Sequence, residues 1–373
     1  MKKSYLIFLV ITTVILLGYL WLGEKKYESG ELRPVFGSKK KPIVRIQYEL
    51  LEERRGKLEP ITSYLLVRHL PQGSRKEYYE AQLTEAMEKD PSVVRTFSFL
   101  LLPMTSVYFS DMENLSSFEE SGDEPNLHKS LGFSPCRERV TFWHKDSDLG
   151  ESFCLGEKTY NEARRYVLWE GKKILLTYQH IWQRYRNSVY SLAEMLFIPN
   201  HWLYNNLELS LSSAKIKARY PKLWQYTQGK LLLVPKKVKS QGQEQIVWHF
   251  SPEGILSESF ATRIQATASS LRYRVLLRIP EKLPKLEPYL SFRLYQKDIA
   301  EREREVAQLT FYQDLPQNAR FQSLSGEKFK TVAGDILVIS PITAGILGKE
   351  EAERLFSIFK EMEEALTPQG QKK

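Results

Sequence analysis

Apolar and polar residues alternate with the two-residue period of a β-strand in many stretches after residue 42. In the first half of the chain these stretches are 43–50, 61–70, 93–102, 139–145, 152–155, 165–169 and 172–178. In the second half they are 207–211, 216–220, 231–234, 271–279, 309–312 and 335–339. Apolar residues at helical spacing predict helices at 77–89, 257–270 and 349–366, and a short amphipathic segment at 180–185. Strands and helices in separate segments predict an α+β fold.

Near the N-terminus, an uncharged stretch of eighteen residues runs from Tyr5 to Leu22. As a helix it would be about 27 Å long, close to the hydrocarbon thickness of a bilayer. Bulky Trp21 and Leu22 stand where a signal peptidase needs small residues. We therefore predict an uncleaved, single-pass transmembrane anchor over residues 1–23, with a cleaved signal peptide as the alternative. The short N-terminal flank favours a cytoplasmic N-terminus in the inner (cytoplasmic) membrane, with the ectodomain on the periplasmic or extracytoplasmic side.

Residues 24–42 are interpreted as a linker, because they contain glycines and a lysine run but no apolar periodicity. The chain beyond them is long enough for two folded domains. We divide it into a first α+β repeat at 43–200, a second at 201–366 and a polar tail at 367–373. The duplication is inferred from three matches that recur in order. Residues 140–143, 156–158 and 170–176 correspond to 309–312, 326–328 and 333–339.

A set of short motifs resembles a known family. Residues 131–135 are Leu-Gly-Phe-Ser-Pro, and Leu155-Gly156 and Tyr166-Val167 follow in later strands. In this order they resemble the membrane-anchored bacterial family known as domain of unknown function 4340, although Gly-Phe stands where Gly-Leu is usual. Trp224 before Pro235 is similar to that family's approach to its second copy. Members often accompany gliding-motility-type ABC transporter components, so the resemblance implies an accessory role and carries over no catalytic residue.

The net charge indicates the kind of partner, and the cysteine content bears on whether a disulfide forms. The formal charge of +9 favours an anionic partner, and for an exported chain this is lipid headgroup or envelope polymer more than nucleic acid. The two cysteines, Cys136 and Cys154, are interpreted as small buried or half-buried thiols, with a disulfide in an oxidising compartment as the alternative.

Known catalytic signatures do not occur in the sequence. It contains no His-Glu-x-x-His and no phosphate-binding glycine-rich loop, and its six histidines are never within four residues of one another. Asp146 and Asp148 are assigned to a hairpin turn, and the acidic stretch 111–124 to a solvated loop, in preference to metal binding. Three tryptophans are assigned to core packing in preference to a sugar-binding platform: Trp143, Trp169 and Trp182. We predict no catalytic residue, no metal and no cofactor.

One basic stretch stands out. Residues 209–243 contain no acidic residue and eight basic ones. Because Lys215, Lys217 and Arg219 alternate, a strand would place all three on one face. The candidate docking face for anionic headgroups or an acidic partner comprises Lys215, Lys217, Arg219, Lys222, Lys236, Lys237 and Lys239. The alternative is a solvated edge strand that carries lysine to prevent aggregation.

Together these patterns predict a non-catalytic, membrane-anchored envelope protein. Its expected role is that of an accessory or scaffold subunit of an ABC-type, gliding-like transport system. Its expected partners are membrane lipid and a transporter permease or another envelope protein, not nucleic acid. The alternatives are an anchored envelope enzyme acting on glycan or lipid, and a receptor-like binding module.

Overall fold

The computed structural model describes residues 32–36, 41–54, 56–71, 76–86, 94–118, 120–121, 125–211, 213–240, 243–252, 254, 256–278, 286–297, 302–313, 315 and 321–367. The predicted anchor from Tyr5 to Leu22 lies outside these residues, as does most of the predicted linker. Among the helices that the structure describes, none has both the length and the apolar composition to cross a bilayer.

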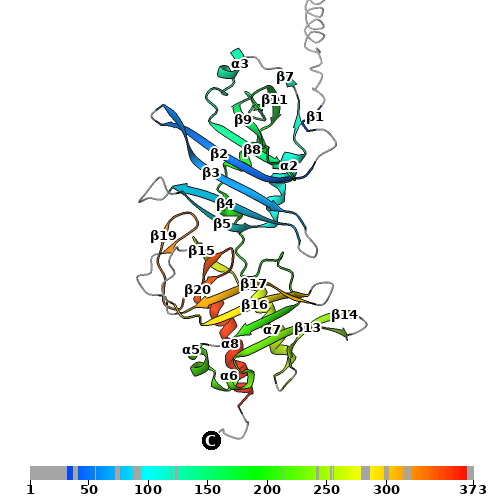
Figure 1. The fold of residues 1–373 in the computed structure, drawn as a ribbon, viewed down its shortest axis with the longest axis vertical. Helices are drawn as coiled ribbons and strands as arrows, with labels where there is room; N and C mark the ends of the chain where they lie inside the picture. The colour runs from blue at the N-terminus through cyan, green and yellow to red at the C-terminus, as the bar shows by residue number, and fades with distance from the viewer. Residues whose placement is uncertain are drawn as a thin grey trace, which may run out of the picture. The chain divides into compact units, whose positions relative to one another are not determined.

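The chain is α+β and divides into two compact units. The first consists of Met1–Leu65 and Ser106–Asn187, and the second of Leu66–Thr105 and Ser188–Lys373. Figure 1 shows the sheets and helices in colours that run from the N-terminus to the C-terminus.

The first sheet has nine strands in the order β5-β4-β3-β2-β8-β9-β10-β11-β7. Their bounds are β2 (Ile43–Arg54), β3 (Lys57–His69), β4 (Tyr78–Ala86), β5 (Val94–Leu101), β7 (Glu120–Ser121), β8 (Glu138–His144), β9 (Glu151–Lys158), β10 (Arg164–Trp169) and β11 (Lys173–Tyr178). Helix α2 (Ser106–Glu113) follows β5, α3 (Pro125–Ser130) precedes β8, and α4 (Gln179–Gln183) with the 3-10 helix η2 (Arg184–Arg186) follows β11. The core here is aromatic, with Phe142, Phe153 and Trp182 all fully buried and in ring contact.

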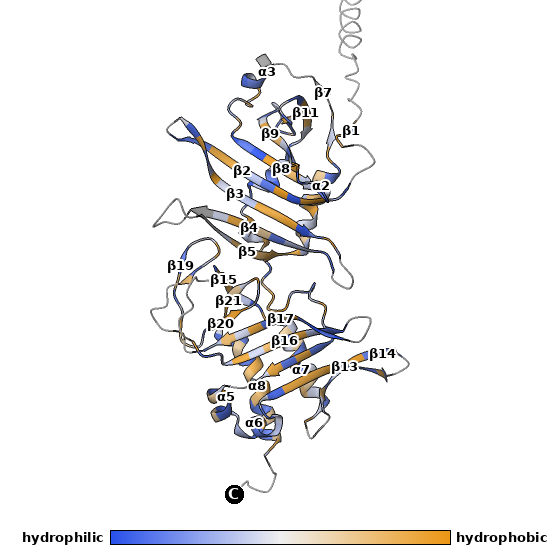
Figure 2. Cartoon of the chain, in the orientation of Figure 1, coloured by the Kyte–Doolittle hydropathy of each residue, from blue (hydrophilic) through white to orange (hydrophobic). Residues whose placement is uncertain are grey.

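The second sheet has eight strands in the order β14-β13-β12-β16-β17-β20-β21-β15. Their bounds are β12 (Asn206–Ser210), β13 (Lys230–Ser240), β14 (Gln243–Ser251), β15 (Tyr273–Leu277), β16 (Leu290–Lys297), β17 (Glu303–Tyr312), β20 (Ile336–Ile339) and β21 (Ala344–Leu347). The helices are α5 (Ala214–Arg219), α6 (Pro221–Thr227), α7 (Glu258–Ser270) and α8 (Lys349–Ala365). Figure 2 shows apolar residues along β16, β17 and α8, where the core of this unit lies.

Both sheets place their chain segments in the same spatial order. A meander, β5-β4-β3-β2 or β14-β13-β12, joins a second meander through the antiparallel pairs β2–β8 and β12–β16. The first sheet has one strand more than the second, β5, at this edge. At the far edge of each sheet lies a short strand, β7 or β15, that comes before the second meander in the sequence. It pairs with the last strand of that meander, β11 or β21. By position, β8 therefore corresponds to β16. The sequence alignment of 140–143 with 309–312 was wrong by one strand, because 309–312 belongs to β17.

Two predicted elements have the wrong secondary structure. The predicted helix at 77–89 is strand β4, where Tyr79, Ala81 and Leu83 are buried in alternation and pair with β5. The predicted strand at 216–220 is helix α5, which Ser213 caps by accepting a hydrogen bond from the N–H of Ile216. In both segments, the spacing of apolar residues is compatible with a helix or with a strand, and contacts with neighbouring segments select between the two. The predicted loop at 111–124 also begins inside α2.

Other predicted elements are confirmed. Helix α7 begins after Ser257, whose hydroxyl accepts a hydrogen bond from the N–H of Ser259. Helix α8 buries one apolar stripe that includes Leu355, Phe359 and Met362. The predicted hairpins at 139–155 and 165–178 are the pairs β8–β9 and β10–β11.

Candidate functional site

The predicted basic docking face does not form a single surface. Lys215, Lys217 and Arg219 lie on helix α5, where each residue turns by about 100°. Lys217 therefore projects from the side opposite to Lys215 and Arg219. This corrects the prediction that all three share a strand face.

The remaining residues of the predicted face lie on two other elements. Lys222 is on α6, and its ammonium donates a hydrogen bond to Thr367 Oγ1 at 2.8 Å. Lys236, Lys237 and Lys239 are on β13, where alternation places Lys237 and Lys239 on one face and Lys236 on the other. The basic residues of this stretch thus separate into three groups, and the group that contains Arg219 adjoins a groove.

Helices α5 and α6 are held against α8 by backbone capping. The Glu363 carboxylate of α8 accepts the N–H groups of Lys222 at 3.0 Å and Leu223 at 2.6 Å, at the start of α6. Pro221 occupies the first turn of α6, where its missing N–H costs nothing. Tyr220, between the two helices, donates its hydroxyl to the carbonyl oxygen of Phe356 at 3.4 Å. Burial raises the pKa of Tyr220 to about 12, so the phenol stays a donor.

This docking fixes the direction of Arg219. Its guanidinium lies 5.4 Å from the centre of the Tyr220 ring and 5.6 Å from that of Phe356. Such cation–π contacts orient a guanidinium without neutralising it. By contrast, Lys217 lies 4.0 Å from the Trp224 ring on the other side of α5.

A groove of about 750 Å³ opens beside Arg219, α8 and β20. Its floor is formed by buried apolar side chains: Tyr220, Ile336, Ala352 and Phe356. Its charged rim consists of Arg219, Lys349, Glu353 and Lys360. A second hollow of about 560 Å³ shares Gln313, Gly334 and Ile336 with it, so the two are neighbours along the same surface.

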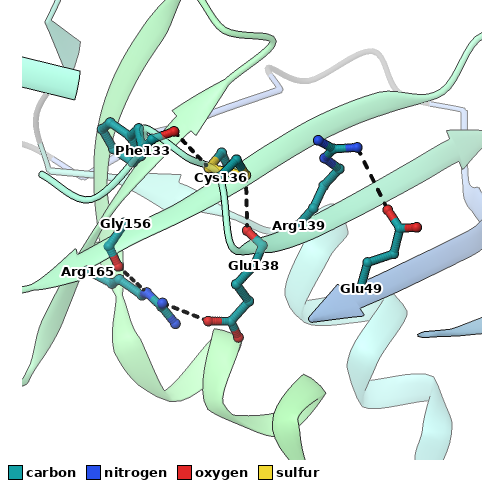
Figure 3. Close-up of a disulfide and its surroundings, with 8 residues drawn as sticks. Glu49, Phe133, Cys136, Glu138, Arg139, Gly156 and Arg165 are labelled. Carbon is teal, nitrogen blue, oxygen red and sulfur yellow. Dashed lines mark hydrogen bonds and ion pairs between the residues drawn. A yellow bond between two sulfur atoms is a disulfide. The ribbon is translucent and has the colours of Figure 1, made fainter. Parts of the chain in front are cut away.

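The first unit contains a buried ionic centre around Glu138 (Figure 3). Glu138 is 2% exposed and accepts hydrogen bonds from Arg165 at 2.7 Å, from Arg186 at 2.9 and 2.5 Å, and from the Tyr48 hydroxyl at 3.0 Å. Burial by itself would raise the pKa of Glu138, but the hydrogen bond from Arg186 and the charges of Arg165 and Arg186 lower it overall. With the carboxylate surrounded by donors, the centre holds β8, β10 and η2 together.

The motif residues of the first unit meet in one corner beside this centre. The N–H of Glu157 donates to the carbonyl oxygen of Leu131 at 2.7 Å, so the turn at 131–135 lies on β9. A Cβ atom at Gly156 would stand 2.3 Å from that oxygen and 2.5 Å from the Phe133 ring. Cys136 and Cys154 form a disulfide across the same corner, with 5.8 Å between their Cα atoms. The interpretation of two separate thiols was wrong, because the fold brings residues 18 apart in sequence onto neighbouring segments.

A three-ring stack lies in the second unit. Tyr78 stacks on His69 at 4.2 Å and on His201 at 4.6 Å between ring centres. Burial and the charge of His69 lower the pKa of His201 to about 4. Burial by itself would raise the pKa of Glu80. The hydrogen bond with His69 at 3.0 Å and further hydrogen bonds outweigh this effect, so the pKa of Glu80 is lowered overall. The cavity beside His201 is only about 90 Å³, too small for more than a few waters.

Asp146 and Trp182, which were assigned to a turn and to the core, lie in such positions. Asp146 lies in the turn between β8 and β9 with a positive φ of 61°, as assigned. Trp182 is fully buried and donates its indole N–H to Thr177 Oγ1 at 2.7 Å. Within the described ranges, no group of three or more His, Cys, Asp or Glu side chains is placed to hold a metal ion.

Sequence reasoning missed both Glu138 with its arginines and the lysines of the groove. For Lys349 and Lys360 a signal existed, since they share one stripe of α8 with Phe356. For Glu138 and Arg165 none existed, because the pair is formed by segments far apart in sequence. No protein-family model, curated protein or solved structure matches the chain.

Proposed function

We propose that this protein is a non-catalytic envelope protein, anchored by one N-terminal membrane helix. In this proposal a duplicated α+β ectodomain stands on the extracytoplasmic side of the inner membrane. It serves as an accessory or scaffold subunit of an ABC-type, gliding-like transport system. The observation that carries the proposal is the packed corner formed by the motif residues.

The corner supports the family resemblance because its residues depend on one another. The turn at 131–135 leaves no room for a side chain at Gly156, and Gly132 has the positive φ of 79° that favours glycine. Motifs that are separated in sequence and meet in space behave as one structural unit. Such a unit supports a shared scaffold more than a shared reaction, so the proposal assigns no catalytic residue.

The disulfide supports the proposed extracytoplasmic location of the ectodomain. Disulfides persist in oxidising compartments such as the periplasm and are rare in the cytosol. Cys136 and Cys154 are the only two cysteines of the chain, and they pair. Together with the uncharged stretch at 5–22, this favours an exported ectodomain.

The common strand order of the two sheets supports the proposed duplication. Two sheets that each combine an edge meander, a helix, a short far-edge strand and a second meander have the arrangement expected of a repeated unit. Two such sheets on one chain give a protein with large surfaces for partners, as an accessory subunit requires.

The experiment has two readouts on the full chain expressed in its own cells. Membrane fractionation followed by N-terminal sequencing should find residues 1–22 retained. Chemical cross-linking in intact membranes, followed by purification, should recover an ABC permease and its ATPase in fixed ratio with this chain. A mature N-terminus beyond Gly23 would refute the anchor. Intact, cross-linked protein without either transporter component would refute the accessory role.

A further inference from the structure

We propose that the groove between α5, α8 and β20 binds an anionic amphiphile, an apolar chain that carries a carboxylate or phosphate. The inference does not depend on the transporter role or on the anchor. It rests on the shape, floor and rim of the groove, all within the second unit.

The rim supplies the charge. Arg219, Lys349 and Lys360 give three positive charges against the single carboxylate of Glu353, a net of +2. Glu353 lies 3.7 Å from Lys349, but both side chains are about two-thirds exposed, so this pair leaves most of the lysine's field in place. Lys360 is likewise only weakly paired, at 4.0 Å from Glu364.

Arg219 is the residue best placed to hold an acidic group. Its guanidinium lies over the aromatic rings of Tyr220 and Phe356 and interacts with the hydroxyls of Tyr220 and Tyr289, and within the described residues it makes no ion pair with a carboxylate. The guanidinium offers a fork of donors that matches carboxylate and phosphate geometry. The rings orient it in advance, so little side-chain entropy remains to be lost on binding.

The floor supplies the apolar contact. Tyr220, Ile336, Ala352 and Phe356 line the bottom of the groove, and because each is at most 6% exposed, they present apolar edges of small area to it. A simple anion would use only the charged rim of the groove. A neutral hydrocarbon would leave the cations of the rim unused. A molecule with both parts uses the whole site.

The length also fits an extended ligand. Lys349 and Lys360 are eleven positions apart on α8, which corresponds to about 16 Å along the helix. Ala352, Phe356 and Ser357 lie between them on the same stripe. The volume of about 750 Å³ is within the range of about 300–1,000 Å³ common for small-molecule sites.

The test uses the full chain in nanodiscs of zwitterionic phosphatidylcholine and a photoreactive fatty acid that carries a diazirine. After illumination, peptide mass spectrometry should find the label on α8 or on the segment that contains α5 and Tyr220. Dodecanoate should compete with the label. The matching photoreactive fatty alcohol, which lacks the charge, should label these peptides at least ten-fold less.

Two variants and one control locate the site. R219Q/K349Q/K360Q should reduce labelling of these peptides at least ten-fold. Ser357→Trp, at an exposed position of α8, should do the same by filling the groove while leaving its charge unchanged. The control K230Q/K237Q/K239Q removes three charges from β13, outside the groove, and should label normally. Circular dichroism confirms that each variant is folded.

The competitors separate the sources of the ligand. Displacement by phosphatidylglycerol in the nanodisc assigns the ligand to membrane lipid, and displacement by dodecanoate alone assigns it to a free amphiphile. Inorganic phosphate or an acidic peptide that competes as well as dodecanoate would overturn the proposal. Equal labelling by the alcohol, or unchanged labelling of the triple variant, would also overturn it.

Discussion

Neutralising Glu138 measures how strongly the buried ionic centre stabilises the first unit. Glu138→Gln keeps the side-chain shape and one acceptor oxygen but removes the charge. Arg165 is 4% exposed and its Nη1 makes no hydrogen bond within the described residues, so its charge would be left buried without a counter-ion. Arg186 is half-exposed and can turn to water. Removing one partner of a buried pair costs about 3–5 kcal/mol, and we expect a loss in that range.

A control and a double variant separate charge from shape. Glu162→Gln removes an exposed carboxylate of the same unit, paired with Lys158 at 2.9 Å, and should cost at most about 1 kcal/mol. The double variant E138L/R165M removes both buried charges together. It should recover most of the loss, because apolar replacement of a buried pair is often close to neutral.

The assay is urea unfolding of the full chain, read by amide hydrogen exchange in peptides from β8 to β11. Local exchange is needed because two units need not unfold in one transition. If Glu138→Gln destabilises these peptides no more than Glu162→Gln does, the centre is not desolvated and the reasoning is refuted.

The remaining predictions follow from the pKa shifts, the disulfide and two close contacts. Because the folded pKa of Glu138 is lowered, its stabilisation is complete above the unfolded value of about 4.3 and is lost as pH falls through the folded value; Glu138→Gln should lack this acid step in a pH series of unfolding. Reduction, or C136S/C154S, should lower the free energy of unfolding by about 3 kcal/mol in denaturant titrations, and the double variant should not respond to reductant. Gly156→Ala should cost about 1–3 kcal/mol or more through its contact with the Leu131 oxygen, whereas Gly348→Ala, with its nearest contact at 3.6 Å, should change thermal stability little. The pKa of His201 should be near 4 in an NMR titration. Since the unfolded chain takes up this proton near pH 6.5, the free energy of unfolding should fall as the pH is lowered from about 6.5 to about 4. His201→Gln should make this fall smaller.

Local patterns were sufficient where the chain's own periodicity agrees with its neighbours. Helices α7 and α8 have apolar stripes, and α7 also has a serine cap, so their sequences predict them directly. The hairpins β8–β9 and β10–β11 likewise follow from alternation between turn residues. The α+β class follows from these elements alone.

Tertiary contacts decided the segments with ambiguous spacing. Residues 78–86 carry apolar side chains that fit a helix or a strand, and pairing with β5 selects the strand. Residues 214–219 alternate in charge, but the cap at Ser213 and packing against α8 select a helix. The basic residues therefore do not share the face that the alternation predicted, and Arg219 instead lines a groove beside α8.

The sequence by itself determined the α+β class, the helices and hairpins with clear periodicity, and an uncharged stretch long enough to span a bilayer. Only the tertiary structure decided the pairing of Cys136 with Cys154, the centre at Glu138 and the groove at Arg219. The physical reason is that side-chain period is a local property of the backbone. Burial, ion pairing and cavities depend on which distant segments meet, and Arg219 meets α8 across more than a hundred residues of chain.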